Sequence, residues 1–161
     1  MKTAVLTISS SVSRGDAEDE SGPLLAGLAE QAGGDVYALE VIPDDFALIE
    51  DRLRHHADED AALIFTTGGT GLTPDDVTPE ATRAVLERSA PGFAEAMRAE
   101  ALRHTPFGLL TRGIAGVRQR SLIVNFPGSP NAVRELFPVI APALEHAVAT
   151  LRDSHGRHSG H

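Results

Sequence analysis

Short apolar runs alternate along the chain with longer segments in which apolar residues recur every three or four positions. The expected strands lie over residues 4–8, 35–42, 61–65 and 122–126. The expected helices begin near residues 21, 44, 78, 91 and 129. Apolar runs of this length, bounded by turn residues, suit strands that are buried on both faces. The alternation predicts an α/β fold, a three-layer α/β/α sandwich with a mostly parallel central sheet.

Start signals accompany most of the expected helices. Ser21 is the expected N-cap of the first helix, and Asp44 with Asp45 caps a helix that runs to about residue 56. Thr78 can cap a helix with proline at its first turn, and Ser129 starts a last long helix to about residue 151.

Three segments give weaker signals. Residues 9–22 have the composition of a long loop, and residues 111–120 suggest a helical turn followed by an irregular strand. Residues 152–161 contain three histidines, and we favour a flexible solvated tail over a metal-binding one because their spacing fits no scaffold. One domain is therefore expected over residues 1–151, with the tail after it.

Composition narrows the functional classes. The formal net charge of -9 argues against a nucleic-acid partner, which needs a basic face. The chain has no cysteine, which excludes thiol catalysis, and Lys2 is its only lysine, which excludes a phosphate-loop lysine. Because the N-terminus lacks a signal-peptide pattern and no apolar run is long enough for a membrane helix, we expect a cytoplasmic protein without a membrane partner.

Polar loops follow all four expected strands. In a parallel sheet, ligands bind beyond the carboxyl ends of the strands, which share one rim. The loops rich in glycine, serine, threonine, aspartate and proline cover residues 9–22, 43–45, 66–79 and 127–130. We therefore expect the functional site at this rim.

The loop over residues 66–71 has the sequence Thr-Thr-Gly-Gly-Thr-Gly. Its glycines let the backbone approach a ligand closely, and its N–H groups can form an anion-binding nest. An ordinary turn would need only one or two glycines, so we favour a phosphate site. It matches neither the Walker A loop nor the dinucleotide fingerprint. The expected binding residues are Thr67, Gly68, Gly69, Thr70 and Gly71.

Carboxylates stand beside this expected phosphate site. Asp75 and Asp76 follow the glycine loop, and Asp44 follows the second strand. Mg²⁺ is commonly held by one or two carboxylates together with substrate phosphates. We favour Asp76 as a metal-binding or catalytic residue, whereas Asp75 and Asp44 could equally be helix caps. The expected shared rim adds weight to Asp44.

The loop before the last helix is a second candidate for anions. A helix N-terminus offers free N–H groups and the positive end of the helix dipole. Pro127, Gly128 and Ser129 lie there, and Ser129 can act as a cap, a phosphate contact or both. Three arginines are candidate anion clamps, although solvated roles are favoured: Arg14, Arg112 and Arg118. His55 and His56 suit a helix end, where a cation is favourable, and receive no functional assignment.

The glycine-threonine loop, followed by Asp-Val-Thr-Pro-Glu-Ala-Thr at 76–82, resembles the signature of the MogA/MoaB family of molybdopterin-binding proteins, whose domain also occurs in gephyrin. Further segments match in order and extend the resemblance to about residue 151. They are Ser9, residues 19–23, 42–44, 91–93 and 125–130. This resemblance adds Ser9, Ser21 and Gly22 to the expected binding residues.

The resemblance implies an α/β/α sandwich that binds molybdopterin, a pterin dithiolene with a terminal phosphate, and ATP with Mg²⁺. It implies adenylylation of molybdopterin with release of pyrophosphate, in which Asp44 and Asp76 align with two important aspartates of the family. It also implies a homotrimer or homohexamer, and the molybdenum-insertion enzyme of the same pathway as a partner.

Some residues depart from the family pattern. Many relatives carry a basic residue at Asn131 and often one at Glu20, and the chain resembles the shorter MoaB type.

The alternative function is a non-catalytic molybdopterin carrier or scaffold, and retention of Asp44 and Asp76 favours the enzyme. A weaker third hypothesis is a hydrolase of sugar phosphates or nucleotides on a similar fold.

Overall fold

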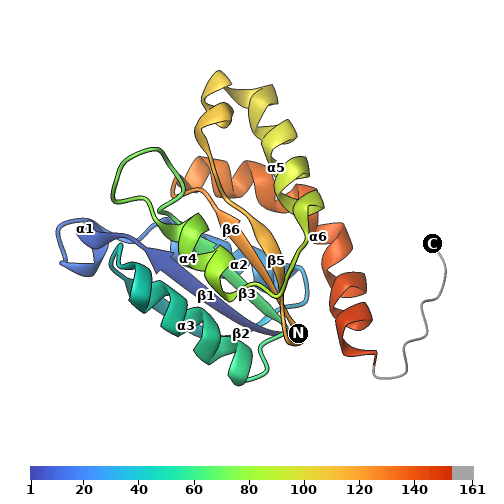
Figure 1. The fold of residues 1–161 in the computed structure, drawn as a ribbon. Helices are drawn as coiled ribbons and strands as arrows, with labels where there is room; N and C mark the ends of the chain where they lie inside the picture. The colour runs from blue at the N-terminus through green and yellow to red at the C-terminus, as the bar shows by residue number, and fades with distance from the viewer. Residues whose placement is uncertain (154–161) are drawn as a thin grey trace.

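A computed structural model describes residues 1–153 as one six-stranded sheet between two layers of helices (Figure 1). The strands are β1 (Lys2–Ile8), β2 (Asp35–Ile42), β3 (Leu63–Thr67), β4 (Arg88–Ser89), β5 (Ala115–Arg118) and β6 (Ser121–Phe126). The helices are α1 (Ser10–Ser13), α2 (Ser21–Gln31), α3 (Phe46–Asp58), α4 (Thr78–Val85), α5 (Pro91–His104), the 3₁₀ turn η1 (Pro106–Leu110) and α6 (Pro130–Arg152).

The sheet has the strand order β2-β1-β3-β6-β5-β4. The first four strands are parallel, whereas β5 and β4 are antiparallel to their neighbours. The central strands β3 and β6 are buried along their whole length, as expected for a parallel sheet covered on both faces. The predicted α/β fold with a mostly parallel sheet is confirmed.

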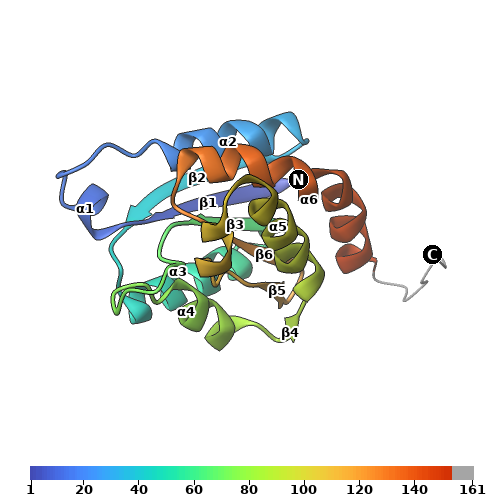
Figure 2. The same cartoon turned by 90° about the horizontal axis from the view of Figure 1, so that it is seen from above.

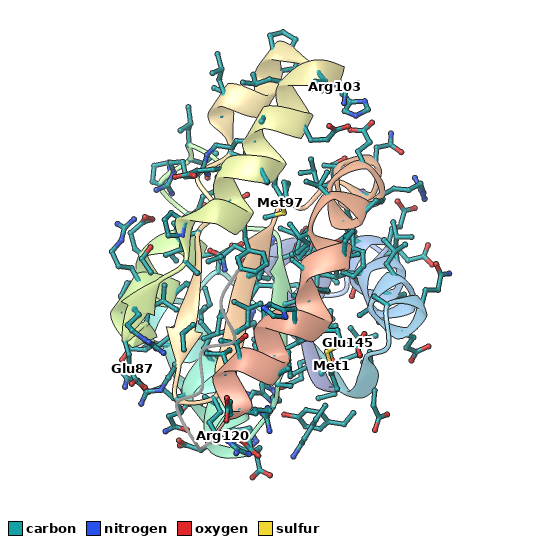
Figure 3. The ribbon with its side chains drawn as sticks, turned by 90° about the vertical axis from the view of Figure 1, so that its right-hand side faces the viewer. Met1, Glu87, Met97, Arg103, Arg120 and Glu145 are labelled. Atoms are coloured by element: carbon teal, nitrogen blue, oxygen red, sulfur yellow. The ribbon has the colours of Figure 1, made fainter. Side chains whose placement is uncertain are left out.

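Two apolar cores separate the layers. Seen from above, α2, α5 and α6 cover one face of the sheet, and α3 and α4 cover the other (Figure 2). On the first face Phe126 and Phe137 stack, and Phe65 meets both rings edge-on. Met97 of α5 points toward α6 in the same core (Figure 3). Because β2, β1, β3 and β6 are parallel, their carboxyl ends lie at a single rim between these layers.

Several predicted boundaries were wrong. The expected loop 9–22 contains α1, and the third strand begins at Leu63 rather than residue 61 and continues to Thr67. The ambiguous stretch 111–120 contains strand β5, and the helical turn η1 precedes this stretch. The short edge strand β4 was missed. A two-residue strand has too few alternating positions to give a sequence signal.

The predicted caps were partly right. Asp45 caps α3 by accepting a hydrogen bond from the Leu48 N–H, and Ser129 caps α6. Ser21 and Thr78 are not caps, because each helix begins one residue earlier than expected and both residues lie inside the first turn. Near α2 the capping acceptor is Asp19, whose carboxylate receives the N–H of Gly22.

His56 lies in the last turn of α3, as expected, but its surroundings do not favour a cation. Its ring is buried between the Tyr37 hydroxyl and the Glu40 carboxylate. Burial lowers the pKa of the His56 imidazole, against the opposing effect of Glu40. The residue therefore belongs to a polar contact between α3 and the edge strand β2.

The amino end of the sheet is held by one carboxylate and two arginines. Asp60, in a left-handed conformation with φ 61°, accepts hydrogen bonds from Arg120 and Arg152. These contacts tie the end of α6 to the turns that precede β3 and β6. Hydrogen bonds from Arg120 and then Arg152 lower the pKa of the Asp60 carboxyl to about 2.

Among residues 1–153, no helix is both long enough and apolar enough to cross a membrane. The predicted histidine-containing tail falls almost entirely on residues 154–161, which lie outside the described residues.

Asp60→Asn tests the stabilising role of this carboxylate. Because the folded pKa is depressed below its ordinary value of 3.8, the charge stabilises the fold above about pH 4 and loses this effect as pH falls toward 2. The variant should be less stable than the wild type at neutral pH, and the difference should shrink in acid. Urea unfolding followed by circular dichroism at several pH values measures this, and a difference that persists unchanged at pH 2 would contradict the assignment. Asparagine also tolerates the left-handed conformation, so the backbone is not strained.

Candidate functional site

A cavity of about 350 Å³ opens at the carboxyl ends of the parallel strands. Its walls come from the ends of β1 and β3 and from the segments that follow β1, β2, β3 and β6. The lining residues are Thr7, Ile8, Ser9, Val12, Glu18, Asp19, Glu20, Ser21, Asp44, Thr67, Gly68, Gly69, Asp76, Gly128 and Pro130. All four polar loops expected at the rim contribute to it.

Close backbone contacts bring the strand ends together. Gly68, with φ 101°, passes so near the carbonyl of Ile8 that a Cβ there would overlap it. A Cβ on Gly128 would lie 3.3 Å from Cα of Gly68. The N–H of Gly68 donates to the carbonyl of Phe126, and the Thr67 hydroxyl donates to that of Pro127. The first glycine of the loop is therefore required by packing, and its N–H is already used.

The next two glycines face the predicted functional carboxylates. A Cβ on Gly69, which has φ 68°, would overlap Oγ1 of Thr78 and lie 3.2 Å from Oδ1 of Asp44. A Cβ on Gly71 would lie 2.8 Å from Oδ2 of Asp76. Because these positions have no side chain, both carboxylates approach the loop backbone closely.

Asp44 is fixed by α1, which the sequence did not reveal. Its Oδ2 accepts hydrogen bonds from the backbone N–H of Ser10 at 3.1 Å and from the Ser10 hydroxyl at 3.0 Å. The Asp44 N–H approaches the same hydroxyl at 3.0 Å. The other oxygen, Oδ1, accepts no hydrogen bond from the described residues, so it is available to a ligand.

Asp76 has a similar arrangement within its own loop. Its Oδ2 accepts hydrogen bonds from the N–H of Thr73 at 3.1 Å and from the Thr73 hydroxyl at 2.9 Å. No hydrogen bond among residues 1–153 ends on its Oδ1. Asp75, for which capping and metal binding were weighed equally, is exposed and does not line the cavity.

The predicted site residues divide between the cavity and its surroundings. Those that line the cavity are Ser9, Ser21, Asp44, Thr67, Gly68, Gly69, Asp76 and Gly128. Pro127 and Ser129 instead line a second cavity of about 430 Å³ on the other side of the same loop. Gly22, Thr70 and Gly71 line neither cavity. Both cavities therefore share the loop that precedes α6.

The charge in the first cavity is strongly negative. Five carboxylates line it, from Glu18, Asp19, Glu20, Asp44 and Asp76, and the described lining residues include no arginine or lysine. An anionic ligand could enter such a cavity only with cations. Within residues 1–153, no group of three or more histidines, cysteines or carboxylates could hold a metal by itself. A metal here would take its remaining ligands from substrate and water.

The candidate anion clamps have other contacts. Arg14 is exposed and pairs with Asp16, which agrees with the favoured solvated role. Arg118 donates to the carbonyl of Val85. Arg112 donates to protein carbonyls and to Glu80, so its guanidinium is a structural group.

Sequence reasoning missed the side chains that hold the carboxylates. Ser10 holds the Asp44 carboxylate and Arg112 holds the Asp76 carbonyl across loops, and no local pattern identifies such partners. Thr73 holds the Asp76 carboxylate from three residues earlier in the same loop. The position of Ser10 directly after Ser9, at a strand end, is the one signal that could have suggested it.

The chain is similar over most of its length to proteins that are named for molybdopterin binding or molybdopterin biosynthesis. A family model described as a probable molybdopterin binding domain matches residues 4–146. The molybdopterin adenylyltransferase of Haemophilus influenzae is 41% identical over 138 residues, which are 84% of this chain and 70% of that protein. The molybdenum cofactor synthesis protein cinnamon of Drosophila melanogaster is 39% identical over 151 residues, 92% of this chain. The match spans only 25% of cinnamon's length.

A solved structure agrees with these matches. The crystal structure of the molybdopterin biosynthesis enzyme MoaB from Thermus thermophilus superposes with a TM-score of 0.88 at 44% sequence identity. The superposition covers 93% of this chain and 95% of that one.

Gly69→Ala tests the close approach of the loop. Its left-handed backbone and the Thr78 hydroxyl both oppose a methyl group, so we expect a loss of about 2 kcal/mol or more in the free energy of unfolding. Gly27→Ala is the matched control, because Gly27 lies in α2 with no atom within 4 Å of an added Cβ and should gain about 0.5–1 kcal/mol. Denaturant unfolding measures the free energy of unfolding of both variants. If the two substitutions change it equally, packing at the rim is looser than described.

Proposed function

The chain belongs to the family of molybdopterin-binding domains, and we propose that it is a molybdopterin adenylyltransferase of molybdenum-cofactor biosynthesis. The observation that carries the proposal is the cavity in which Asp44 and Asp76 face the glycine loop. Each carboxylate has one oxygen held by the protein and one oxygen that accepts no hydrogen bond from residues 1–153. A non-catalytic carrier has no evident need for two carboxylates arranged in this way.

The charge of the cavity supports Mg²⁺ as the ion that accompanies ATP. The free oxygens of Asp44 and Asp76 are hard oxygen ligands of the kind that Mg²⁺ takes, with phosphates and water completing its coordination. When bound, Mg²⁺ would neutralise phosphate oxygens and polarise the α-phosphorus of ATP. The residues present therefore fit the ion, and the five carboxylates explain why ATP would enter as its metal complex.

The proposed reaction is a transfer between two phosphates. An oxygen of the terminal phosphate of molybdopterin attacks the α-phosphorus of ATP and forms the new P–O bond. The bond from the α-phosphorus to the bridging oxygen breaks, and pyrophosphate leaves with that electron pair. A phosphate monoester is largely dianionic at pH 7, so the attack needs no protein base.

The protein's own contribution is to hold two anionic groups in line. The loop after Gly68 offers backbone N–H groups, and the first turn of α6, marked by Gly128 and Pro130 in the lining, brings the positive end of a 23-residue helix to the cavity. Such fixed donors stabilise developing charge without reorganisation during the reaction. Positioning of this kind can account for a large part of the rate of a transfer between bound reactants.

Incubation with molybdopterin, ATP and Mg²⁺ tests the proposal directly. Pyrophosphate should be released, and adenylylated molybdopterin should be found by mass spectrometry. If the protein binds molybdopterin without releasing pyrophosphate, the enzyme assignment fails and the carrier function replaces it.

Asp76→Asn should lower turnover by on the order of 100-fold or more, because a neutral amide is a poor ligand for Mg²⁺. The fold should be kept, since the amide oxygen can still accept the hydrogen bonds of Thr73. The rate of pyrophosphate release and the circular dichroism spectrum are the measurements.

Asp45→Asn is the control for this substitution. Asp45 neighbours Asp44 but caps α3, and asparagine is an equally good N-cap. This variant should keep the wild-type rate, and full activity of Asp76→Asn would show that the metal is held elsewhere.

We further propose that the chain assembles with copies of itself, as a homotrimer or homohexamer, through the end of α5 and η1. This segment lies at the top of Figure 1. Its exposed large apolar side chains are Leu102 (45%), Phe107 (73%), Leu109 (73%) and Leu110 (46%). Exposed apolar side chains gathered in one place commonly mark a protein interface. The molybdenum-insertion enzyme as a partner and the cytoplasm as the location stay predictions from the sequence.

Phe107→Ser combined with Leu109→Ser should reduce the molar mass in solution to that of a single chain, because it removes the most exposed apolar side chains of this interface. Light scattering coupled to size-exclusion chromatography measures the mass. Leu39→Ser on the edge strand β2, where Leu39 is 46% exposed, is the control and should leave the assembly intact. An unchanged mass in the double variant, or a monomeric wild type, would rule out this surface.

A further inference from the structure

We propose that Arg112 is a positioning residue that sets the Asp76 carboxylate in the cavity by holding both ends of the loop that carries it. This inference rests on the proposed function, because it concerns the carboxylate assigned to Mg²⁺. Arg112 does not line the cavity and contacts no atom proposed to react. Its effect would pass through the backbone of residues 71–76.

The loop between β3 and α4 has little support of its own. Residues 72–75 are all exposed, and Leu72 is 65% exposed despite its apolar side chain. The N–H of Thr78 in α4 donates to the carbonyl of Gly69 at 3.1 Å and closes the base of the loop. Within residues 70–77 the hydrogen bonds run only between Thr73 and Asp76. They close a small turn but do not fix where that turn lies relative to the cavity.

Arg112 provides this missing connection. Its Nε donates to the carbonyl of Gly71 at 2.8 Å, and its Nη2 donates to the carbonyl of Asp76 at 2.8 Å. Its backbone N–H donates to the carbonyl of Thr70 at 2.9 Å. Since the guanidinium is planar and rigid, it fixes the separation between the two ends of the loop.

The guanidinium is itself held by α4. Nη1 and Nη2 donate to the two carboxylate oxygens of Glu80 at 2.8 and 3.0 Å, in a bidentate pair. The hydrogen bonds from Arg112 lower the pKa of the Glu80 carboxyl, so Glu80 stays charged at neutral pH. The loop is thereby attached to α4, whose residues Ala81 and Val85 are packed into the apolar core.

The position of Asp76 follows from these contacts. Its carbonyl is bound by Arg112, while its carboxylate turns back toward Gly71, the other residue that Arg112 holds. A change in either end of the loop would therefore move the carboxylate relative to Asp44 across the cavity. Misplacement of a catalytic group by about 1 Å can cost on the order of 100-fold in rate.

The test compares Arg112→Lys with Arg120→Lys. Lysine keeps the charge but cannot hold two carbonyls and a carboxylate in one plane. Arg120, which is labelled in Figure 3, makes a bidentate pair with Asp60 at the amino ends of β3 and β6, whereas the cavity lies at their carboxyl ends. Arg112→Lys should lower kcat by about 100-fold at saturating ATP, and Arg120→Lys should leave it unchanged.

Chemical rescue separates positioning from a general loss of structure. Arg112→Ala leaves a space beside the carbonyls of Gly71 and Asp76, which millimolar guanidinium can occupy. Added guanidinium should restore part of the turnover of Arg112→Ala and none of the activity of Asp76→Asn. The inference is wrong if guanidinium does not restore turnover of Arg112→Ala and Arg112→Lys keeps the wild-type kcat.

Mn²⁺ affinity gives a readout that does not need turnover. Mn²⁺ replaces Mg²⁺ and is visible by electron paramagnetic resonance, so its binding with ATP can be titrated in each variant. Arg112→Lys should bind Mn²⁺ more weakly than wild type and Arg120→Lys equally well. If wild type binds Mn²⁺ with ATP but releases no pyrophosphate, the proposed function fails. The inference about Arg112 is then still tested by the Mn²⁺ affinities of the two variants. If wild type binds no Mn²⁺, or if Arg112→Lys binds it normally, the inference about Arg112 is wrong.

Discussion

Backbone segments from different strands pass one another at the rim of the sheet at distances that only glycine allows. Gly68 crosses the carbonyl of Ile8, and Gly128 approaches Gly68 from the loop before α6. Gly69 then leaves room for Asp44 and for the Thr78 hydroxyl. Without these approaches the four loops could not enclose one cavity, and the carboxylates would lie on separate surfaces. The glycines thus make room for the site because they have no side chains, in addition to any N–H groups that they offer to phosphate.

Positive charge is distributed in an unusual way around this cavity. Arg112, which holds the loop that carries Asp76, binds carbonyls and a carboxylate of the protein, and none of the described lining residues is basic. The arginine side chain therefore determines the shape of the site. The positive charge that balances phosphate would come from a metal ion, helix N-termini and backbone N–H groups. A site built in this way can bind an anion strongly only when the metal is present, which suits a reaction whose substrate is a metal–nucleotide complex.

Sequence patterns identified the fold and the rim, and missed the contacts that complete them. The buried strands, the glycine loop and Asp44 and Asp76 each have a local signal, since composition and spacing are visible along the chain. The family resemblance stated from those residues is confirmed by the matching family model and relatives. The contacts of Ser10 and Arg112 have no such signal, because their partners lie across loops in space. Thr73 was missed although its partner, Asp76, is only three residues away. Ser21 and Thr78 were misassigned as caps, because a shift of one residue in a helix start is below the resolution of sequence reasoning.

The salt-bridged turn at Asp60 has a consequence for how this domain can be combined with others. Arg152 binds Asp60 at the amino ends of the strands, and β1 starts at the same end, so both ends of the described chain leave the molecule far from the cavity. Additional polypeptide could continue from either end without covering the site. The domain can therefore be carried as one module of a larger protein, as in cinnamon, where the matching region is a quarter of the length. The opening of the cavity therefore lies away from the points where further polypeptide would be attached.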